Sequence, residues 1–195
     1  MTGKEFVDSI NKNPSWCASL KNPLEVTTFA DLYGSLITHL SPLITFSGRD
    51  ASGNSADLSY CENLKVATGT FNGFISFVNS GVEKIEKLNI TGASINGDSI
   101  NFSGCENLKV ATGTYKGAAV FHSSGVTTIK NLNIETPNDQ GRMAYFRGCP
   151  ITYVPKKYRT KKFQFDKTIK KQSDLIDIRQ AAINKIKSES NNIEI

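Results

Sequence analysis

CENLKVATGT, the ten residues from 61 to 70, is repeated without change at residues 105–114. Identity across a spacing of 44 residues indicates a repeat architecture. The same spacing separates all four cysteines of the chain, which are Cys17, Cys61, Cys105 and Cys149. We therefore expect the chain to fold as a stack of similar units.

Each 44-residue unit divides into two shorter units, and each of these begins with a large apolar residue. The leading apolar positions are 32, 58, 77, 102, 121 and 146, so the steps between them are 26, 19, 25, 19 and 25 residues. Units this short cannot bury their apolar side chains alone and must stack on one another. Counting a degenerate copy around Cys17, we predict a repeat solenoid of about seven coils over residues 14–155. Short parallel β-strands such as 88–90 and 132–134 are joined by irregular turns.

The cysteines predict a buried structural ladder rather than a set of disulfides. Serines take the equivalent place in the longer coils, so the predicted column reads Cys17, Ser35, Cys61, Ser80, Cys105, Ser124 and Cys149. Successive cysteines are two coils apart, about 10 Å at one strand spacing per coil. This separation exceeds the Cα distance of roughly 7 Å that a disulfide tolerates. We therefore expect four reduced, buried thiols.

Two motifs resemble the bacterial leucine-rich repeats of the BspA type over roughly residues 14–155. These are Phe102-x-x-Cys105-x-x-Leu108 and the strand pattern Ile85-x-x-Leu88-x-Ile90. The chain departs from the family after the strand, where the expected Asn or Cys falls at Ala93 and Pro137. The resemblance implies a leucine-rich-repeat-like fold that recognises a protein or mediates adhesion through one face, without catalysis.

Both ends of the chain are predicted to carry helical caps. Residues 1–13 form a capping helix, in which Thr2 and Glu5 fit a capping box. Residues 156–195 form a basic cap, with a helix from about Ser173 to Lys187. This segment has 11 Lys/Arg and 5 Asp/Glu, a net charge of +6, whereas residues 1–155 have 12 and 13, a net charge of −1. The segment is either a cap with solvated lysines or a binding arm whose basic residues are Lys156, Lys157, Arg159, Lys161 and Lys162.

No convergent catalytic or metal-binding constellation is found in the sequence. His39 and His122 occupy different repeat positions and lack a recurring carboxylate partner. The carboxylates of a calcium-like loop around Asp50 and Asp57 are not kept in later copies. We therefore expect a protein that is not an enzyme and has neither a cofactor nor a metal.

The leading functional hypothesis is a non-enzymatic binding module whose solenoid face recognises another protein, of unknown identity. The candidate binding residues are Lys21, Lys65, Lys109, Lys87, Asn89, Asn131 and Asn133. Alternatives are nucleic-acid or polyanion binding through the basic segment, or a small inhibitor or immunity protein from a phage or mobile element. We expect a monomer without a membrane span. The N-terminus lacks a secretory pattern, which favours a cytoplasmic location and leaves export without a signal open.

Overall fold

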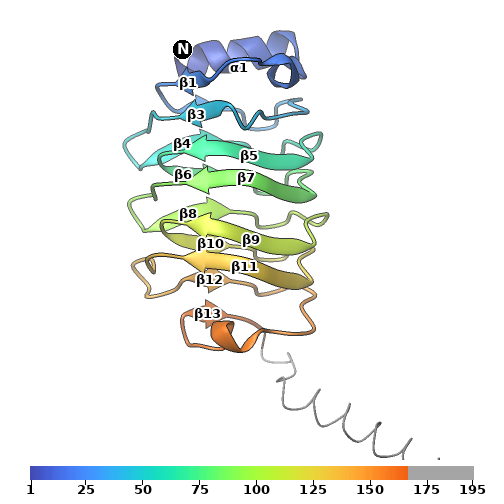
Figure 1. Cartoon of the computed structure of the whole chain (residues 1–195), viewed down its shortest axis with the longest axis vertical. Helices are drawn as coiled ribbons and strands as arrows, with labels where there is room; N and C mark the ends of the chain where they lie inside the picture. The colour runs from blue at the N-terminus through green and yellow to red at the C-terminus, as the bar shows by residue number, and fades with distance from the viewer. Residues whose placement is uncertain (167–195) are drawn as a thin grey trace, which may run out of the picture.

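Two all-parallel β-sheets make up most of the protein (Figure 1). The computed structural model describes residues 1–166. Along the chain the strands alternate between the sheets, which have the orders β1-β3-β5-β7-β9-β11 and β13-β12-β10-β8-β6-β4-β2. The helix predicted from Ser173 to Lys187 lies outside the described residues.

The elements are short, and the longest strands, β5, β7, β9 and β11, all belong to the six-stranded sheet. That sheet contains β1 (Leu24–Val26), β3 (Ile44–Phe46), β5 (Val66–Phe71), β7 (Lys84–Ile90), β9 (Val110–Tyr115) and β11 (Thr128–Ile134). The seven-stranded sheet contains β2 (Ala30–Asp31), β4 (Asn54–Asp57), β6 (Phe74–Ser76), β8 (Asp98–Asn101), β10 (Ala118–Val120), β12 (Ala144–Tyr145) and β13 (Phe163–Gln164). The described helices are α1 (Gly3–Lys12) and the 3₁₀ turns η1 (Trp16–Ser19) and η2 (Lys156–Tyr158).

The predicted fold, a leucine-rich-repeat-like solenoid with helical caps at both ends, is wrong. A leucine-rich repeat places one strand of each repeat in a single curved sheet. Here a 44-residue unit supplies two strands to each of two facing sheets, as β5 to β8 do over residues 66–101. The described residues also contain one α-helix, α1, at the N-terminal end. The apolar periodicity requires stacking, but it is compatible with both architectures.

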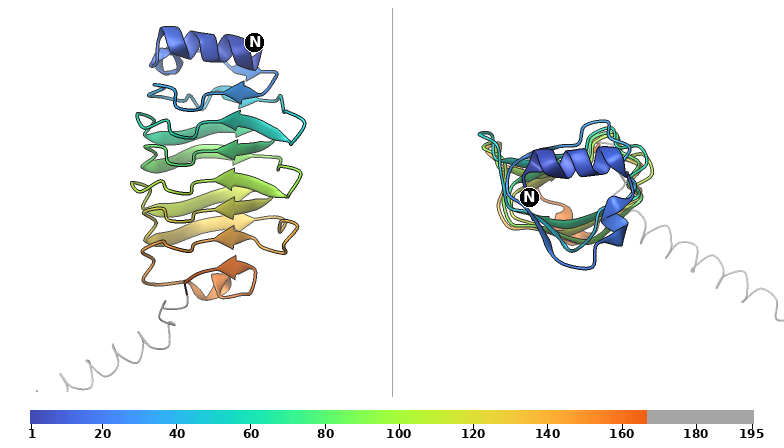
Figure 2. Two further views of the ribbon diagram at one scale, coloured as in Figure 1. Left: turned by 180° about the vertical axis from the view of Figure 1, so that it is seen from behind. Right: turned by 90° about the horizontal axis from the view of Figure 1, so that it is seen from above.

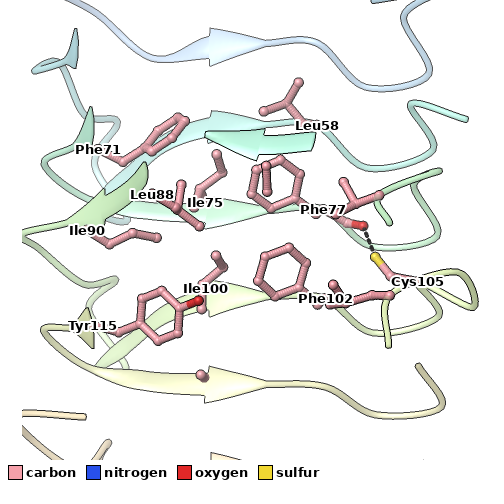
Figure 3. Packing of buried hydrophobic residues seen from close by; sticks show 14 of the residues in the cluster. Leu58, Phe71, Ile75, Phe77, Leu88, Ile90, Ile100, Phe102, Cys105 and Tyr115 are labelled. Atoms are coloured by element: carbon pink, nitrogen blue, oxygen red, sulfur yellow. Dashed lines mark hydrogen bonds between the residues drawn. The ribbon is translucent and has the colours of Figure 1, made fainter. Parts of the chain in front are cut away.

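We call one passage of the chain through a strand of each sheet a circuit. Seen along the stack, successive circuits superpose (Figure 2). The space between the sheets is filled by rings lying one above another, in particular Phe77, Phe102, Phe121, Phe146 and Phe165, whose neighbouring centroids lie 5.0–5.6 Å apart. Figure 3 shows part of this stack. Phe165 follows Phe146 by 19 residues, so the repeat register continues past residue 155.

A sharp corner follows six strands of the seven-stranded sheet, from β2 to β12, and brings the chain back toward the other sheet. Two residues after each leading apolar residue, the backbone has a positive φ, at Gly34, Tyr60, Asn79, Gly104, Ser123 and Gly148. Side chains just before the corner hold it. The Asp57 carboxylate accepts from the Ser59 amide at 2.9 Å, and Asn101 accepts from the Ser103 amide at 2.9 Å.

Glycine is required where two circuits approach each other most closely. At Gly125 a Cβ atom would lie 1.8 Å from the Glu106 carbonyl oxygen, because the Gly125 amide donates to the Cys105 carbonyl of the neighbouring circuit at 3.0 Å. Gly81 has the same relation to Glu62, at 1.9 Å. The tripeptide Ser-Gly-Val occurs at residues 80–82 and 124–126, and its glycine is therefore required by the packing of neighbouring circuits.

Replacing Gly125 by alanine is expected to lower the free energy of unfolding by at least about 3 kcal/mol, because backbone must move to admit the methyl group. The matched control is Gly141→Ala. Gly141 has a positive φ of 72°, unlike Gly125, and a Cβ there meets nothing within 4 Å. Its cost is backbone strain alone, about 1 kcal/mol. Urea denaturation of both variants measures the difference, and equal costs would contradict the close approach.

The N-terminal end of the stack is covered by α1 and the residues around it. Phe6 and Ile10 of α1 are buried, and the Phe6 ring lies 5.2 Å from that of Phe46. The capping box of Thr2 and Glu5 is present. Beside the helix, the terminal amine of Met1 donates to the Glu25 carbonyl of β1 at 2.8 Å. The first edge of the six-stranded sheet is therefore occupied by the chain itself.

At the C-terminal end, side chains replace the backbone of a further circuit. The Tyr158 hydroxyl accepts from the Leu132 amide at 3.0 Å and donates to the Leu132 carbonyl at 2.9 Å. The Gly148 amide donates to an Asp166 carboxylate oxygen at 2.9 Å, where the equivalent Ser123 amide donates to the backbone carbonyl of Arg147. Tyr158 therefore covers part of the last edge of the six-stranded sheet, and an uncovered edge of this kind pairs readily with other chains.

The variant Tyr158→Phe is expected to destabilise the protein by about 1–3 kcal/mol, because it leaves the two Leu132 backbone groups unsatisfied in a buried place. Tyr153→Phe is the control, since Tyr153 is 36% exposed and should change stability by less than about 0.5 kcal/mol. Thermal unfolding followed by circular dichroism measures both. Equal melting temperatures for the two variants would refute the role of Tyr158 at this edge.

Candidate binding surfaces

The cysteine and serine column predicted from the repeat is present at the corners between the sheets. Pairs on neighbouring circuits are in contact: Ser35 with Cys61 at 3.5 Å, Ser80 with Cys105 at 3.4 Å, and Ser124 with Cys149 at 3.3 Å. Each of these thiols also donates to the carbonyl of the leading apolar residue of that neighbouring circuit, as Cys105 does to Phe77 at 2.9 Å (Figure 3). All four cysteines are buried and free, as the 44-residue spacing predicts.

Burial makes these thiols poor nucleophiles. It raises the pKa of Cys17 to about 12, and it also raises the pKa values of Cys61, Cys105 and Cys149, with hydrogen bonds from the paired serines acting in the opposite direction. The thiolate is the reactive form, so at pH 8 the folded protein presents almost none. The column is therefore part of the corner packing and not a chemical site.

At pH 8, a disulfide reagent that reacts with free thiols is expected to label fewer than one cysteine per molecule of native protein. The reaction time is the time in which a short peptide with one cysteine is labelled completely. In 6 M guanidinium chloride the reagent should label four, which mass spectrometry of the adducts would count. Rapid labelling of Cys61 or Cys105 in the folded protein, with unchanged circular dichroism, would contradict their burial.

The outer face of the six-stranded sheet carries a continuous row of polar side chains. Backbone register places in this row Glu25, Thr45, Thr70, Asn89, Thr114 and Asn133. One strand spacing separates neighbours, so the row is about 24 Å long. The candidate binding residues Asn89 and Asn133 are separated in the row by Thr114, because β9 lies between β7 and β11.

The threonines of this row were missed in the sequence. Thr70 and Thr114 end the identical ten-residue stretch, and each precedes a buried ring, Phe71 or Tyr115. After Gly69 and Gly113 a polar residue alternates with an aromatic one. This alternation is typical of a strand, and it could have predicted that the threonine side chain points outward.

The predicted lysines lie at one margin of the same sheet. Lys65 and Lys109 immediately precede β5 and β9, and both are exposed. Lys65 forms a half-exposed ion pair with Glu83 at 3.3 Å, and the Lys109 ammonium donates to the Glu106 carbonyl at 2.8 Å. Lys21 is exposed before β1. Five residues separate Lys65 from Thr70, about 17 Å along a strand, so the lysines lie at the start of the strands and the polar row near their ends.

Lys87 and Asn131 occupy β-bulges between these two parts. The register with the preceding strand shifts before Leu88 and before Leu132, which leaves one extra residue in β7 and β11. Lys87 has a φ of 49° and Asn131 a φ of 52°. A bulge re-aims the side chain it contains and increases the local twist. Both side chains are exposed on this sheet.

The basic residues at the C-terminal end are a second exposed group. Lys156, Lys157, Arg159, Lys161 and Lys162 are all exposed. Two of them pack locally: the Lys157 ammonium lies 4.6 Å from the centre of the Tyr158 ring, and the Arg159 Nε donates to the Val154 carbonyl at 2.8 Å. None of the three ion pairs found within residues 1–166 involves these five residues.

The histidines stay apart in the fold. The His39 ring hydrogen-bonds to the Thr38 hydroxyl at 2.8 Å, whereas His122 lies 5.4 Å from the Tyr145 ring, above an open hollow that Arg147 and Asp166 also line. Across residues 1–166, no group of three His, Cys, Asp or Glu residues is arranged to hold a metal ion. No helix in the described part is long and apolar enough to cross a membrane.

Comparison with known proteins returned no matching family model, no matching curated protein and no matching solved structure.

Proposed function

We propose that the protein is a non-enzymatic binding module that recognises another protein through the outer face of its six-stranded sheet. The observation that carries this proposal is the row of small polar side chains from Thr45 to Asn133, which hydrogen-bonded strands hold at regular intervals. A face held in place by backbone pairing loses little conformational entropy when a partner binds.

Charge on this face supports selectivity for a partner. Lysines and glutamates on the same strands flank the row at exposed positions, including Lys84, Glu86, Lys87 and Lys130. A mixed pattern of this kind disfavours any partner that would place a charge opposite a residue of the same charge on this face. The Lys116–Glu135 ion pair, at 3.0 Å, lies just past the ends of β9 and β11, on the side of the row opposite the lysines 65 and 109.

A second candidate function is polyanion binding, favoured by the exposed basic residues 156–162 at the C-terminal end. Residues that neutralise phosphates release counterions, so affinity for a nucleic acid falls steeply as salt rises. Binding to a protein through a mixed-charge face has a weaker salt dependence. Salt dependence therefore distinguishes the two candidate functions.

The double substitution Lys65→Glu with Lys109→Glu is expected to weaken binding to the cognate protein about tenfold, because it reverses two charges at the margin of the proposed face. The free energy of unfolding should change by less than about 1 kcal/mol, since the Lys65–Glu83 pair is half-exposed. The partner is first isolated by affinity purification from the native host at two salt concentrations, and affinity is then measured by calorimetry.

The matched control makes the same charge change at the other candidate surface, with Lys161→Glu and Lys162→Glu. Unchanged affinity in this control, together with loss in the first variant, supports the sheet face. If the Lys161→Glu and Lys162→Glu variant alone loses affinity, and wild-type binding is lost between 50 and 300 mM salt, the binding site is the basic C-terminal end and not the sheet face. Intact binding in both variants, with folding verified by circular dichroism, would reject both surfaces.

A further inference from the structure

Two exposed tyrosines lie together at the first corners of the seven-stranded sheet. Tyr33 follows β2 and Tyr60 follows β4, and their ring centroids are 5.0 Å apart at an interplanar angle of 49°. Tyr33 is 61% exposed and Tyr60 44%. Elsewhere along the stack, large aromatic rings such as Phe77 and Phe102 lie inside the sandwich. This pair instead faces solvent.

The backbone conformation of Tyr60 is strained for a residue with a bulky side chain. Tyr60 has a φ of 60°, in the left-handed region that bulky residues avoid. The other circuits place Gly34, Asn79, Gly104, Ser123 or Gly148 at the equivalent corner, residues that adopt this conformation more readily or are small. Burial does not compensate for the strain, because almost half of the side chain is exposed. A strained residue that does not serve the core indicates a functional requirement for the ring.

Three acidic residues belong to the same two chain segments as the two rings. Asp31 and Asp57 are direct neighbours in the β2–β4 pairing. Each uses its Oδ1 atom to accept from a corner amide, that of Tyr33 at 3.2 Å and that of Ser59 at 2.9 Å. Glu62 is exposed two residues after Tyr60. The three neighbouring segments 31–36, 57–62 and 76–81 contain no Lys or Arg, so this corner has a local excess of negative charge.

An exposed aliphatic side chain completes the surface. Leu36 is 65% exposed, and the contact of Ser35 with Cys61 at 3.5 Å brings its segment beside Glu62. We define the tyrosine patch as Asp31, Tyr33, Leu36, Asp57, Tyr60 and Glu62. It therefore offers ring faces, carboxylates and one apolar side chain within two neighbouring circuits.

We propose that the tyrosine patch binds the lysine or arginine side chains of a basic polypeptide partner. A cation over a tyrosine ring is attracted by the negative face of the ring. A guanidinium can stack on a ring while its N–H groups donate to a carboxylate, and the aliphatic stem of either side chain can pack on Leu36. Charge complementarity thus selects a basic segment over an acidic or a neutral one. The site lies on the seven-stranded sheet, apart from the face proposed above.

The probe is a fluorescein-labelled nonapeptide with four arginines spaced by glycines, compared with the same peptide carrying glutamines. Fluorescence anisotropy with the full chain at 50 mM salt measures both affinities. The arginine peptide is expected to bind at least tenfold more tightly. The double substitution Tyr33→Leu with Tyr60→Leu should lower the affinity for the arginine peptide about fivefold to twentyfold, since leucine keeps the apolar bulk but lacks the ring face. Tyr153→Leu, at an exposed tyrosine outside the patch, should leave it unchanged.

Two further variants separate binding from folding. Asp31→Asn with Asp57→Asn keeps the corner hydrogen bonds, because an amide oxygen accepts as a carboxylate does, and should weaken the arginine peptide several-fold. Tyr60→Gly relieves the positive φ, so the melting temperature should stay level or rise while the affinity falls. A lower melting temperature with unchanged affinity would make Tyr60 a structural residue and overturn the proposal.

Equal affinities for the arginine and glutamine peptides would also overturn it. So would salt-sensitive self-association of the free chain, detected by sedimentation velocity and abolished by the tyrosine substitutions, because the patch would then be occupied by a second copy of the chain.

Discussion

Vertical alignment of neighbouring circuits at the corners is the constraint on which the rest of the structure depends. A thiol donates to a carbonyl of the preceding circuit, as Cys105 does to Phe77, and stacked rings continue the same register inside. The close approach at Gly125 is possible only because that register is maintained. Since each circuit buries little area alone, an error at one corner would shift every side chain of the following strands.

The ends of the stack matter as much as its interior, because parallel sheets expose unpaired backbone at their edges. Here the edges are covered by groups of the chain itself, with Met1 at the first edge of the six-stranded sheet and Tyr158 at its last. Asp166 substitutes a carboxylate for a backbone carbonyl. Within residues 1–166, the outer faces of the sheets and the exposed corners are surfaces open to a partner.

Prediction from the sequence succeeded for residues that occupy the same position in every repeat, because such residues have the same surroundings in the fold. The cysteine column follows from identical spacing, since residues 44 apart must lie two circuits apart. The second sheet was missed because strands such as β6 and β10 have three residues, too few for an apolar period to be read. The repeat was also ended too early, because Phe165 lies in a stretch where basic residues obscure the pattern.

By itself, the sequence determined the length of the repeat, the buried thiols and the helix near the N-terminus, because these depend on identity, spacing and local capping. Only the tertiary structure decided that the circuits form two parallel sheets, that Thr114 separates Asn89 from Asn133, and that Tyr33 meets Tyr60. These relations join residues about 20 or more positions apart. Their physical origin is the parallel pairing of whole circuits, and the chain order alone does not specify which sheet each short strand joins.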